Sequence, residues 1–474
     1  MGRRKNKNRS VPQIELVEGR KNGKDDDDDD DDDSTAEKQE EKIIEILVEG
    51  SDILLEVFSR LNPQTLFKFK SVSKGFCNFI GQAEFAAHHY RNCKAIAGRT
   101  LTGLFFQGKE QSNLHDEELR LLDKVDFLPV ESEAGGIPDP SLEFLKQRGN
   151  TEGVEILDSC NGLLLCMRYT SNTPIKSYFV CNPLTKQKVA LPNPKKPYNR
   201  ISFALMADFD HNYLKYKVLC LFKGSDNTYS KLMILSSETT GDWMVLEQEL
   251  PPVSYEFLNG SKAFFNGSLF WDCIEGHILV CDFNVNRKKD RCKLIEAPRA
   301  PLGRCLWKSE HKLHCYCHGF EDEYPEWTLT INDDGKQDYN WKPEKSEQFR
   351  NLTDDFSAKL DSDNWLIERK AKPRIQFKII SYAPESKTLH LFIPDGIYAY
   401  EFTERRLEFL GSFRHCRDRV FHSESCVSPY VHSLLPIQNT GRADGEAEAA
   451  TEMKKVRGRH NKRTPQCQDY TLTG

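Results

Sequence analysis

The sequence predicts an α+β protein of two folded parts, a small helical module and a large all-β domain, between two disordered tails. From about residue 43 to 92, apolar side chains recur with the spacing of helix faces. From 93 to 437 they alternate in short runs separated by Gly, Pro, Asn and Asp, as strands joined by turns do. Residues 1–42 and 438–474 carry dense charge and too little apolar surface for a core.

Charge is concentrated in the two tails. Arg3–Arg9 and Lys454–Arg463 are basic, whereas Asp25–Asp33 is an unbroken acidic run. The acidic run favours a solvated linker, with a docking tract for a basic partner as the alternative. The basic clusters resemble nuclear localisation signals, and no secretory signal or membrane span is recognised. We therefore expect a protein of the nucleus, the cytoplasm or both, with its 15 cysteines reduced.

The helical module has more apolar side chains than its own core needs. Ser51 is a candidate cap for a first helix, Asn62-Pro63 ends that helix and begins a second, and a third follows Gly75. One reading is a three-helix domain closed on its own core. A module of about 45 residues is marginal alone, however, so several of its large apolar residues should face outward. Exposed apolar patches usually mark binding surfaces, which favours a partner interface.

Residues 51–90 resemble an F-box. The start Asp-Ile-Leu-x-Glu-x-x-x-Arg-Leu, the middle Phe-Lys-x-Val-Ser-Lys and the end Phe-x-x-x-His have that family's spacing. Three departures are Glu49-Gly50 for the usual Leu-Pro, Pro63 one place late, and Phe76 for the usual Trp. The resemblance implies docking to a SKP-type adaptor of a cullin-RING (SCF) ubiquitin ligase. The implied adaptor-binding residues are Leu54, Phe58, Leu61, Pro63, Leu66, Val72 and Phe76.

The large domain has the spacing of a β-propeller. Turns such as Asn161-Gly162 and Asn266-Gly267 precede apolar strands at intervals of roughly 40 to 65 residues, which suits four-stranded blades. About 340 residues allow five to seven blades, and we favour six. A last strand near Pro429–Leu435 would close the ring. Ser141–Gln147 is a predicted helix after Pro140. The alternative architecture is a sandwich or two smaller β domains.

The expected strands are short apolar runs. They include Thr102–Phe106, Gly162–Met167, Tyr178–Cys181, Tyr216–Phe222, Lys231–Leu235, Leu269–Asp272, His277–Phe283, Lys312–Cys317, Gln376–Ser381, Thr388–Phe392 and Ile397–Phe402. Several stretches of this domain are similar to the F-box-associated, kelch-like domain of plant F-box proteins. They include Asp158–Leu164, Cys181–Lys186, Tyr216–Val218, Ser236–Thr239, Phe265–Trp271 and Pro429–Val431. In that family the domain captures the protein destined for ubiquitination.

Catalytic and metal-binding patterns are weak in this sequence. Gly-x-Ser-x-Gly, Gly-x-Gly-x-x-Gly, the Walker loop and His-Glu-x-x-His are absent. The residue types at His311, His314, Cys315, Cys317 and His318 suit zinc, but a strand would point the histidines and cysteines to opposite faces. We therefore expect no metal or cofactor. No basic stripe with interleaved aromatics predicts nucleic-acid binding.

Three individual residues are candidates with ordinary structural explanations. Cys160 is a possible reactive thiol, although a cysteine in an apolar strand is usually inert. Trp271 and Trp307 suit blade anchors better than a ligand cage.

The combined pattern predicts a non-catalytic substrate-recognition subunit of an SCF-type ligase. The helical module would bind the adaptor with its cullin and RING partners, and the propeller would hold a target protein that the sequence does not identify. One alternative is a ligase-independent interaction scaffold, possible because Glu49-Gly50 replaces the usual apolar entry. A propeller enzyme is the other alternative, and it requires converging carboxylates or metal ligands at one mouth.

Overall fold

The computed structural model of this 474-residue chain describes most of the helical module and of the β domain. The described residues are 52–97, 101–111, 119–130, 137–146, 152–170, 173–194, 201–210, 212–223, 230–239, 242–246, 250, 261–274, 276–283, 292–300, 304–308, 312–317, 326–329, 339–344, 352, 355, 378–383, 387–393, 396–411 and 426–438. Both tails, together with the predicted Ser51 cap and the Glu49-Gly50 entry, lie outside them.

The helical module contains four helices in the described residues. They are α2 (Asp52–Phe58), α3 (Pro63–Phe69), α4 (Lys74–Gly81) and α5 (Ala83–Ala97). Side-chain caps begin α3 and α4. Asn62 Oδ1 accepts a hydrogen bond from the Thr65 N–H at 2.7 Å, and Ser73 Oγ accepts one from the Phe76 N–H at 3.1 Å. The predicted break at Asn62-Pro63 is confirmed, because Pro63 occupies the first turn of α3.

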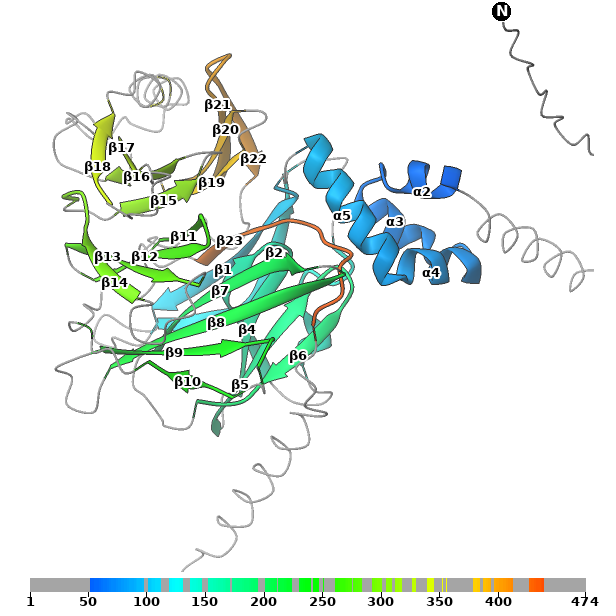
Figure 1. The fold of residues 1–474 in the computed structure, drawn as a ribbon, viewed down its shortest axis with the longest axis horizontal. Helices are drawn as coiled ribbons and strands as arrows, with labels where there is room; N and C mark the ends of the chain where they lie inside the picture. The colour runs from blue at the N-terminus through cyan, green and yellow to red at the C-terminus, as the bar shows by residue number, and fades with distance from the viewer. Residues whose placement is uncertain are drawn as a thin grey trace, which may run out of the picture.

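The β domain is a propeller in which the described strands form six antiparallel sheets (Figure 1). The first blade is β2 (Leu119–Pro129), β1 (Gly103–Gln111) and β23 (Cys426–Tyr430). The second is β3 (Glu152–Cys160), β4 (Leu163–Thr170), β5 (Thr173–Asn182) and β6 (Gln187–Leu191). The third is β7 (Ile201–Asp210), β8 (Tyr213–Lys223), β9 (Ser230–Ser236) and β10 (Met244–Val245).

Three further blades complete the ring. The fourth is β11 (Lys262–Phe265), β12 (Ser268–Ile274), β13 (His277–Asp282) and β14 (Cys292–Glu296). The fifth is β15 (Arg304–Lys308), β16 (Leu313–Cys317), β17 (Glu326–Leu329) and β18 (Trp341–Glu344). The sixth is β19 (Lys378–Ala383), β20 (Thr388–Ile393), β21 (Gly396–Glu401) and β22 (Arg406–Gly411). The six-bladed prediction is confirmed, and the sandwich alternative is wrong.

The ring is closed by a strand from the far end of the chain. β23 pairs with β1, with Phe105 opposite Ser428, and β23 lies beside both β3 and β19. The expected closing strand, Pro429–Leu435, is displaced toward the C-terminus from the observed one, since pairing ends at Tyr430. Beyond it the chain bonds to blade three instead. The Leu214 N–H donates to Pro436 O at 2.9 Å, and the Gln438 N–H donates to Leu214 O at 3.0 Å.

Two predicted turns form as expected, whereas one predicted helix does not form. Asn161-Gly162 and Asn266-Gly267 all have positive φ, as the tight turns of β-hairpins require. The predicted helix at Ser141–Gln147 is wrong, because only the 3₁₀ turn η1 (Glu143–Leu145) forms there. Leu142 has φ 56° and Asp139 bonds to Ser141 and to the Phe144 N–H, so the chain turns instead of continuing a helix.

The helical module packs directly against the propeller. Figure 1 shows α2–α5 to one side of the sheets, with the orange-to-red segment after β23 running toward them. The Tyr90 ring of α5 lies 4.5 Å from the Phe209 ring of β7. Leu435 and Ile437 belong to the same apolar cluster as Phe85 of the module and residues of blades two and three. The two parts therefore share one continuous core.

Candidate protein-interaction surfaces

The helical module leaves a set of apolar side chains at its surface. Ile53 is 74% exposed, Val57 49% and Val72 62%. Ile53, Val57 and half-buried Leu61 are spaced four residues apart, so the first two lie on one side of α2 and Leu61 follows at its end. Val72 lies in the turn between α3 and α4. Exposed apolar residues gathered on so small a module are typical of a binding surface.

A cluster of aromatic rings holds the three short helices under this surface. Phe58 of α2 stacks on Phe69 of α3 with ring centroids 5.5 Å apart, and Phe76 of α4 meets Phe58 edge-on at 5.3 Å. Phe79 meets Phe58 at 6.0 Å in the same way. Such pairs stabilise the packing beyond their buried area. They fix the relative positions of the helices that carry the exposed residues.

The structure divides the residues implied by the F-box resemblance into two groups. Leu54, Leu61, Pro63 and Phe76 are half-buried, and Val72 is exposed, so these five are accessible to a partner. The other two are core residues in this structure. They are Phe58, which is 6% exposed, and Leu66, which is 0% exposed. Side chains this enclosed stabilise the module but present almost no surface for a partner.

Two accessible residues were not among the expected contacts. Ile53 and Val57 belong to the apolar pattern of the first helix, yet the F-box resemblance did not imply them as contacts. The signal was present, because Ile53, Val57 and Leu61 form one row at every fourth position while Leu54 and Phe58 form the next. Only the packing of α3 and α4 decides which row is covered.

Helix α5 packs against the rest of the module and bonds to the end of its first helical segment. His89 is 3% exposed, and its Nε2 donates to Leu61 O at 2.7 Å. Asn92 Nδ2 donates to Ser59 Oγ at 2.9 Å. Burial lowers the pKa of His89, so its ring stays neutral while it bonds to the end of the first helical segment. Since Tyr90 of the same helix contacts the propeller, α5 joins the exposed surface to the large domain.

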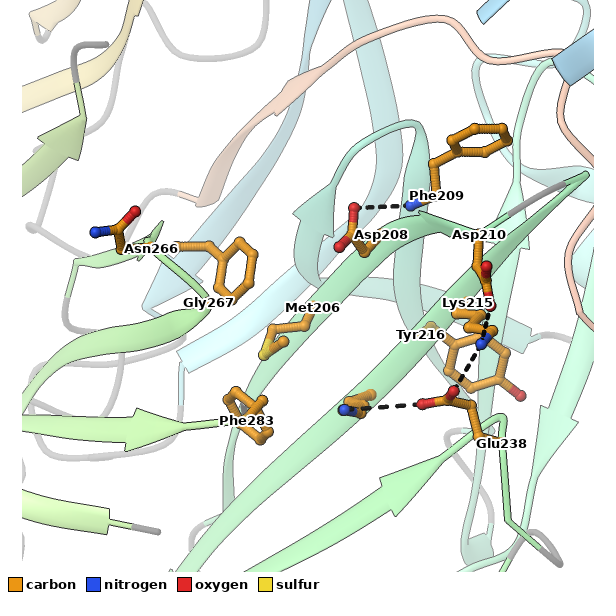
Figure 2. A pocket seen from close by; sticks show the side chains of 12 residues that line it. Met206, Asp208, Phe209, Asp210, Lys215, Tyr216, Glu238, Asn266, Gly267 and Phe283 are labelled. Atoms are coloured by element: carbon orange, nitrogen blue, oxygen red, sulfur yellow. Dashed lines mark hydrogen bonds and ion pairs between the residues drawn. The ribbon is translucent and has the colours of Figure 1, made fainter. Parts of the chain in front are cut away.

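A second candidate surface is a groove between blades three and four. Its volume is about 740 Å³. Figure 2 shows Met206 and Phe283 together, with Asp210, Lys215 and Glu238 grouped to one side of them and Asp208 above. The lining residues are Met206, Asp208, Phe209, Asp210, Lys215, Tyr216, Lys217, Glu238, Phe264, Asn266, Gly267 and Phe283.

The charged side chains of this groove form a partly neutralised network. Lys215 makes an ion pair with Asp210 and donates to Glu238 Oε1 at 2.7 Å, and the hydrogen bonds to these carboxylates raise the pKa of Lys215. Lys217 Nζ lies 3.8 Å from Glu238 Oε2 and 5.3 Å from the centre of the Phe283 ring. Asp208 is exposed, and its Oδ1 accepts a hydrogen bond from the Phe209 N–H at 2.8 Å.

Of the described residues that suggested zinc, Cys315 and Cys317 come together, with their Sγ atoms 3.9 Å apart, but His314 bonds elsewhere. His311 and His318 lie outside the described residues. Cys315 and Cys317 are buried, while His314 bonds to Glu326 at 2.9 Å and stacks on Trp307 at 4.8 Å. In the described part of the chain, no three His, Cys, Asp or Glu side chains are grouped as metal ligands.

The remaining single candidates have structural partners. Cys160 Sγ accepts from the Ala207 N–H at 3.3 Å at the junction of blades two and three. Trp271 is fully buried under Lys262, whose Nζ lies 5.4 Å from the ring centre. Trp307 is 7% exposed and stacks on His314. Both tryptophans therefore act as blade anchors, as expected. None of the helices among the described residues is long and apolar enough to span a membrane.

Two family profiles match this chain. Residues 51–86 match the F-box domain, and residues 137–345 match the family described as "F-box protein At3g26010-like, beta-propeller". The matches fall on the helical module and on the second to fifth blades. The chain therefore carries an F-box domain followed by a β-propeller domain of the kind found in F-box proteins.

Curated F-box proteins from Arabidopsis thaliana are similar to this chain in sequence. F-box protein At5g03970 is 25% identical over 301 residues, which cover 62% of this chain and 63% of the relative. F-box protein At5g07610 is 27% identical over 257 residues, 51% of this chain and 56% of the relative. Each alignment thus spans less than two thirds of the relative's length. Among solved structures, a fucose-specific lectin from Aleuria aurantia is 11% identical, covers 68% of this chain and 90% of its own, and has a TM-score of 0.30. That score is too low to carry an argument.

Proposed function

We propose that this chain is the substrate-recognition subunit of an SCF-type cullin-RING ubiquitin ligase. The F-box module binds a SKP-type adaptor, which joins it to the cullin and RING subunits, and the kelch-like propeller holds the target protein. The chain itself is non-catalytic. It brings the target close to the enzyme that carries ubiquitin, and it decides which protein is modified.

The observation that carries this proposal is the exposed apolar surface of the F-box module. Ile53, Val57 and Val72 are exposed although the rest of the module is stabilised by an aromatic cluster and by contact with the propeller. Their exposure is unfavourable for a monomer in water, and burial against an adaptor removes that unfavourable contact. The propeller adds loops from six blades, where a rigid scaffold usually carries binding residues.

Co-purification tests the first half of the proposal. The full chain is co-expressed with a plant SKP-type adaptor and analysed by size-exclusion chromatography, first alone and then with the cullin and RING subunits. We expect a stable complex with the adaptor, and ubiquitin transfer to a protein bound by the propeller. A full chain that elutes apart from the adaptor at micromolar concentrations contradicts the proposal.

One sequence feature favours a second candidate, an interaction scaffold outside any ligase. Glu49-Gly50 replaces the Leu-Pro that the F-box family has at this point, which substitutes a charge for an apolar contact. Restoring the apolar pair with Glu49→Leu and Gly50→Pro distinguishes the two candidates. If only the restored variant binds the adaptor, the natural chain is a scaffold; if both bind, the ligase assignment holds.

We also propose that the protein works in the nucleus, the cytoplasm or both. The basic clusters Arg3–Arg9 and Lys454–Arg463 support this proposal, because they resemble import signals. A fluorescent fusion of the full chain tests it, with Gln substitutions in both clusters as the comparison. Fluorescence outside the cell, or confined to an organelle other than the nucleus, would contradict it.

A further inference from the structure

We propose that the groove between blades three and four binds a basic segment of the target protein. A Lys or Arg side chain of that segment lies among the carboxylates of the groove and pairs with exposed Asp208, and an apolar neighbour packs against Phe264 and Phe283. This inference rests on the proposed function, since it assigns the target-binding site of the receptor and the chemical class of what it binds.

The groove is a place where two neighbouring blades leave room between them. Other junctions are joined by direct bonds. Between blades two and three, Asp158 Oδ2 accepts from the Leu205 N–H at 2.7 Å. Between blades four and five, buried Arg304 donates to Asp272 at 2.7 Å. Blades three and four share an apolar cluster that includes Met206 and Trp271, and about 740 Å³ is open beside it, within the range of pockets that hold ligands.

The charge of the groove favours a cationic occupant. Three carboxylates (Asp208, Asp210 and Glu238) and two ammonium groups (Lys215 and Lys217) line it, so one negative charge is left over. Both lysines already have carboxylate partners at their own blade. The exposed Asp208 carboxylate accepts a hydrogen bond from the adjacent Phe209 N–H through Oδ1. An acidic segment would be repelled here, whereas a Lys or Arg would complete the pairing.

The apolar part of the groove indicates what accompanies the cation. Phe264 and Phe283 are half-buried and give the groove an accessible apolar side, and they pack against the buried cluster that contains Met206. Phe283 already accepts one cation over its ring, from Lys217 at 5.3 Å. Residues two apart in an extended peptide point to the same face. A Lys-x-Leu or Arg-x-Leu sequence would therefore place its cation and its apolar side chain in the groove together.

Peptide binding to the full chain in complex with the adaptor tests this inference. The probes are two fluorescein-labelled decapeptide libraries, one with a fixed Lys-x-Leu core and one with a Glu-x-Leu core, compared by fluorescence anisotropy. We expect the Lys library to bind at least tenfold more tightly. The double variant Asp208→Asn, Glu238→Gln should lose at least tenfold of that affinity. Glu404→Gln, an exposed carboxylate on blade six, is the matched control and should stay within twofold.

Two results would overturn the inference. One is equal affinity for both libraries, or an unchanged affinity in the double variant. The other is a tenfold gain in probe affinity when the basic tail of the full chain is neutralised, which would make that tail the occupant. The neutralised positions are Lys454, Lys455, Arg457 and Arg459, each changed to Gln.

Adaptor binding separates a failure of this inference from a failure of the proposed function. Asp208 and Glu238 lie on blade three and not on the F-box module, so their double variant should co-purify with the adaptor as the wild type does. Peptide binding that fails while adaptor binding persists overturns only the groove. Loss of the adaptor from the wild-type chain overturns the proposed function whatever the peptides show. Equal melting temperatures of variant and wild type confirm that the variant is folded.

Discussion

Replacing two exposed valines of the F-box module should abolish adaptor binding without unfolding the protein. Val57 is 49% exposed and Val72 62% exposed. Full burial of a valine side chain contributes about 1.5–3 kcal/mol, so covering the exposed part contributes about 0.7–1.5 kcal/mol at Val57 and about 0.9–1.9 kcal/mol at Val72. The double variant Val57→Asp, Val72→Asp therefore loses about 2–3 kcal/mol of the binding free energy that apolar burial against the adaptor contributes. Desolvating the new carboxylates adds at least about 1 kcal/mol. Affinity should therefore fall more than a hundredfold, at about 1.4 kcal/mol per tenfold.

Isothermal titration calorimetry with purified adaptor measures this loss, and two variants control for other causes. Val245→Asp makes the same change at a valine that is 51% exposed on the outer strand β10 of the propeller, and it should bind normally. Leu66→Ala removes a fully buried side chain instead. It should lower the free energy of unfolding by about 2–5 kcal/mol, yet bind the adaptor normally at temperatures where the module is folded.

Either of two results would refute the reasoning. If the Val57, Val72 double variant binds within threefold of the wild type, the exposed residues are not the interface. If folded Leu66→Ala loses as much affinity as the double variant, the module must open on binding and expose its core. The enthalpy of adaptor binding and the melting curve of each variant distinguish these two cases. A module that opens on binding would expose its apolar core to water before the adaptor covers it.

Three further predictions concern the propeller. Gly162→Ala should lower the melting temperature by several degrees, because Gly162 has φ +90° and an added Cβ would lie 2.6 Å from Ser433 Cβ. Asp272→Ala should cost about 3–5 kcal/mol in a denaturant titration, because Arg304 would stay buried without its carboxylate. Burial lowers the pKa of His432 from 6.5 to about 4. The unfolded chain therefore binds the proton more readily, and stability should fall by up to about 3 kcal/mol as pH drops from 6.5 to 4. His432→Phe should weaken that fall in melts over this pH range, and an unchanged slope would contradict the assignment.

Local pattern was enough to predict those elements whose causes are local. Alternation of apolar residues gives strands, Asn62-Pro63 separates two helices, and Asn161-Gly162 suits backbone of positive φ. The closing strand was displaced because apolar Leu434 and Leu435 continue the pattern past Tyr430, where they pack into the cluster shared with the helical module and do not pair with β1. Both the predicted and the observed strand contain Pro429, a residue that cannot donate within a sheet. It is tolerated where the strand pairs with β1 on one side.

The functional surfaces were harder to predict, because burial is a tertiary property. Leu66 and Val72 are both apolar and six residues apart, yet one is fully buried and the other mostly exposed. Nothing in their local sequence distinguishes them. The groove has the same origin, since Asp208, Glu238 and Phe283 come from separate strands and turns that only the ring of blades brings together. Charge runs in the tails were conspicuous in the sequence, whereas this small set of carboxylates was not.

The shared core gives the two surfaces a defined relation to each other. Phe209 lines the groove and also contacts Tyr90 of α5 at 4.5 Å, so one ring lies between the groove and the F-box module. The segment that follows the closing strand reaches the same place through the Leu214 bonds to Pro436 and Gln438. A linker would let the adaptor and a captured segment move independently, but a packed core resists such motion because interiors are close-packed. In the proposed complex, the distance from adaptor to target would thus be set by the same contacts that stabilise the fold.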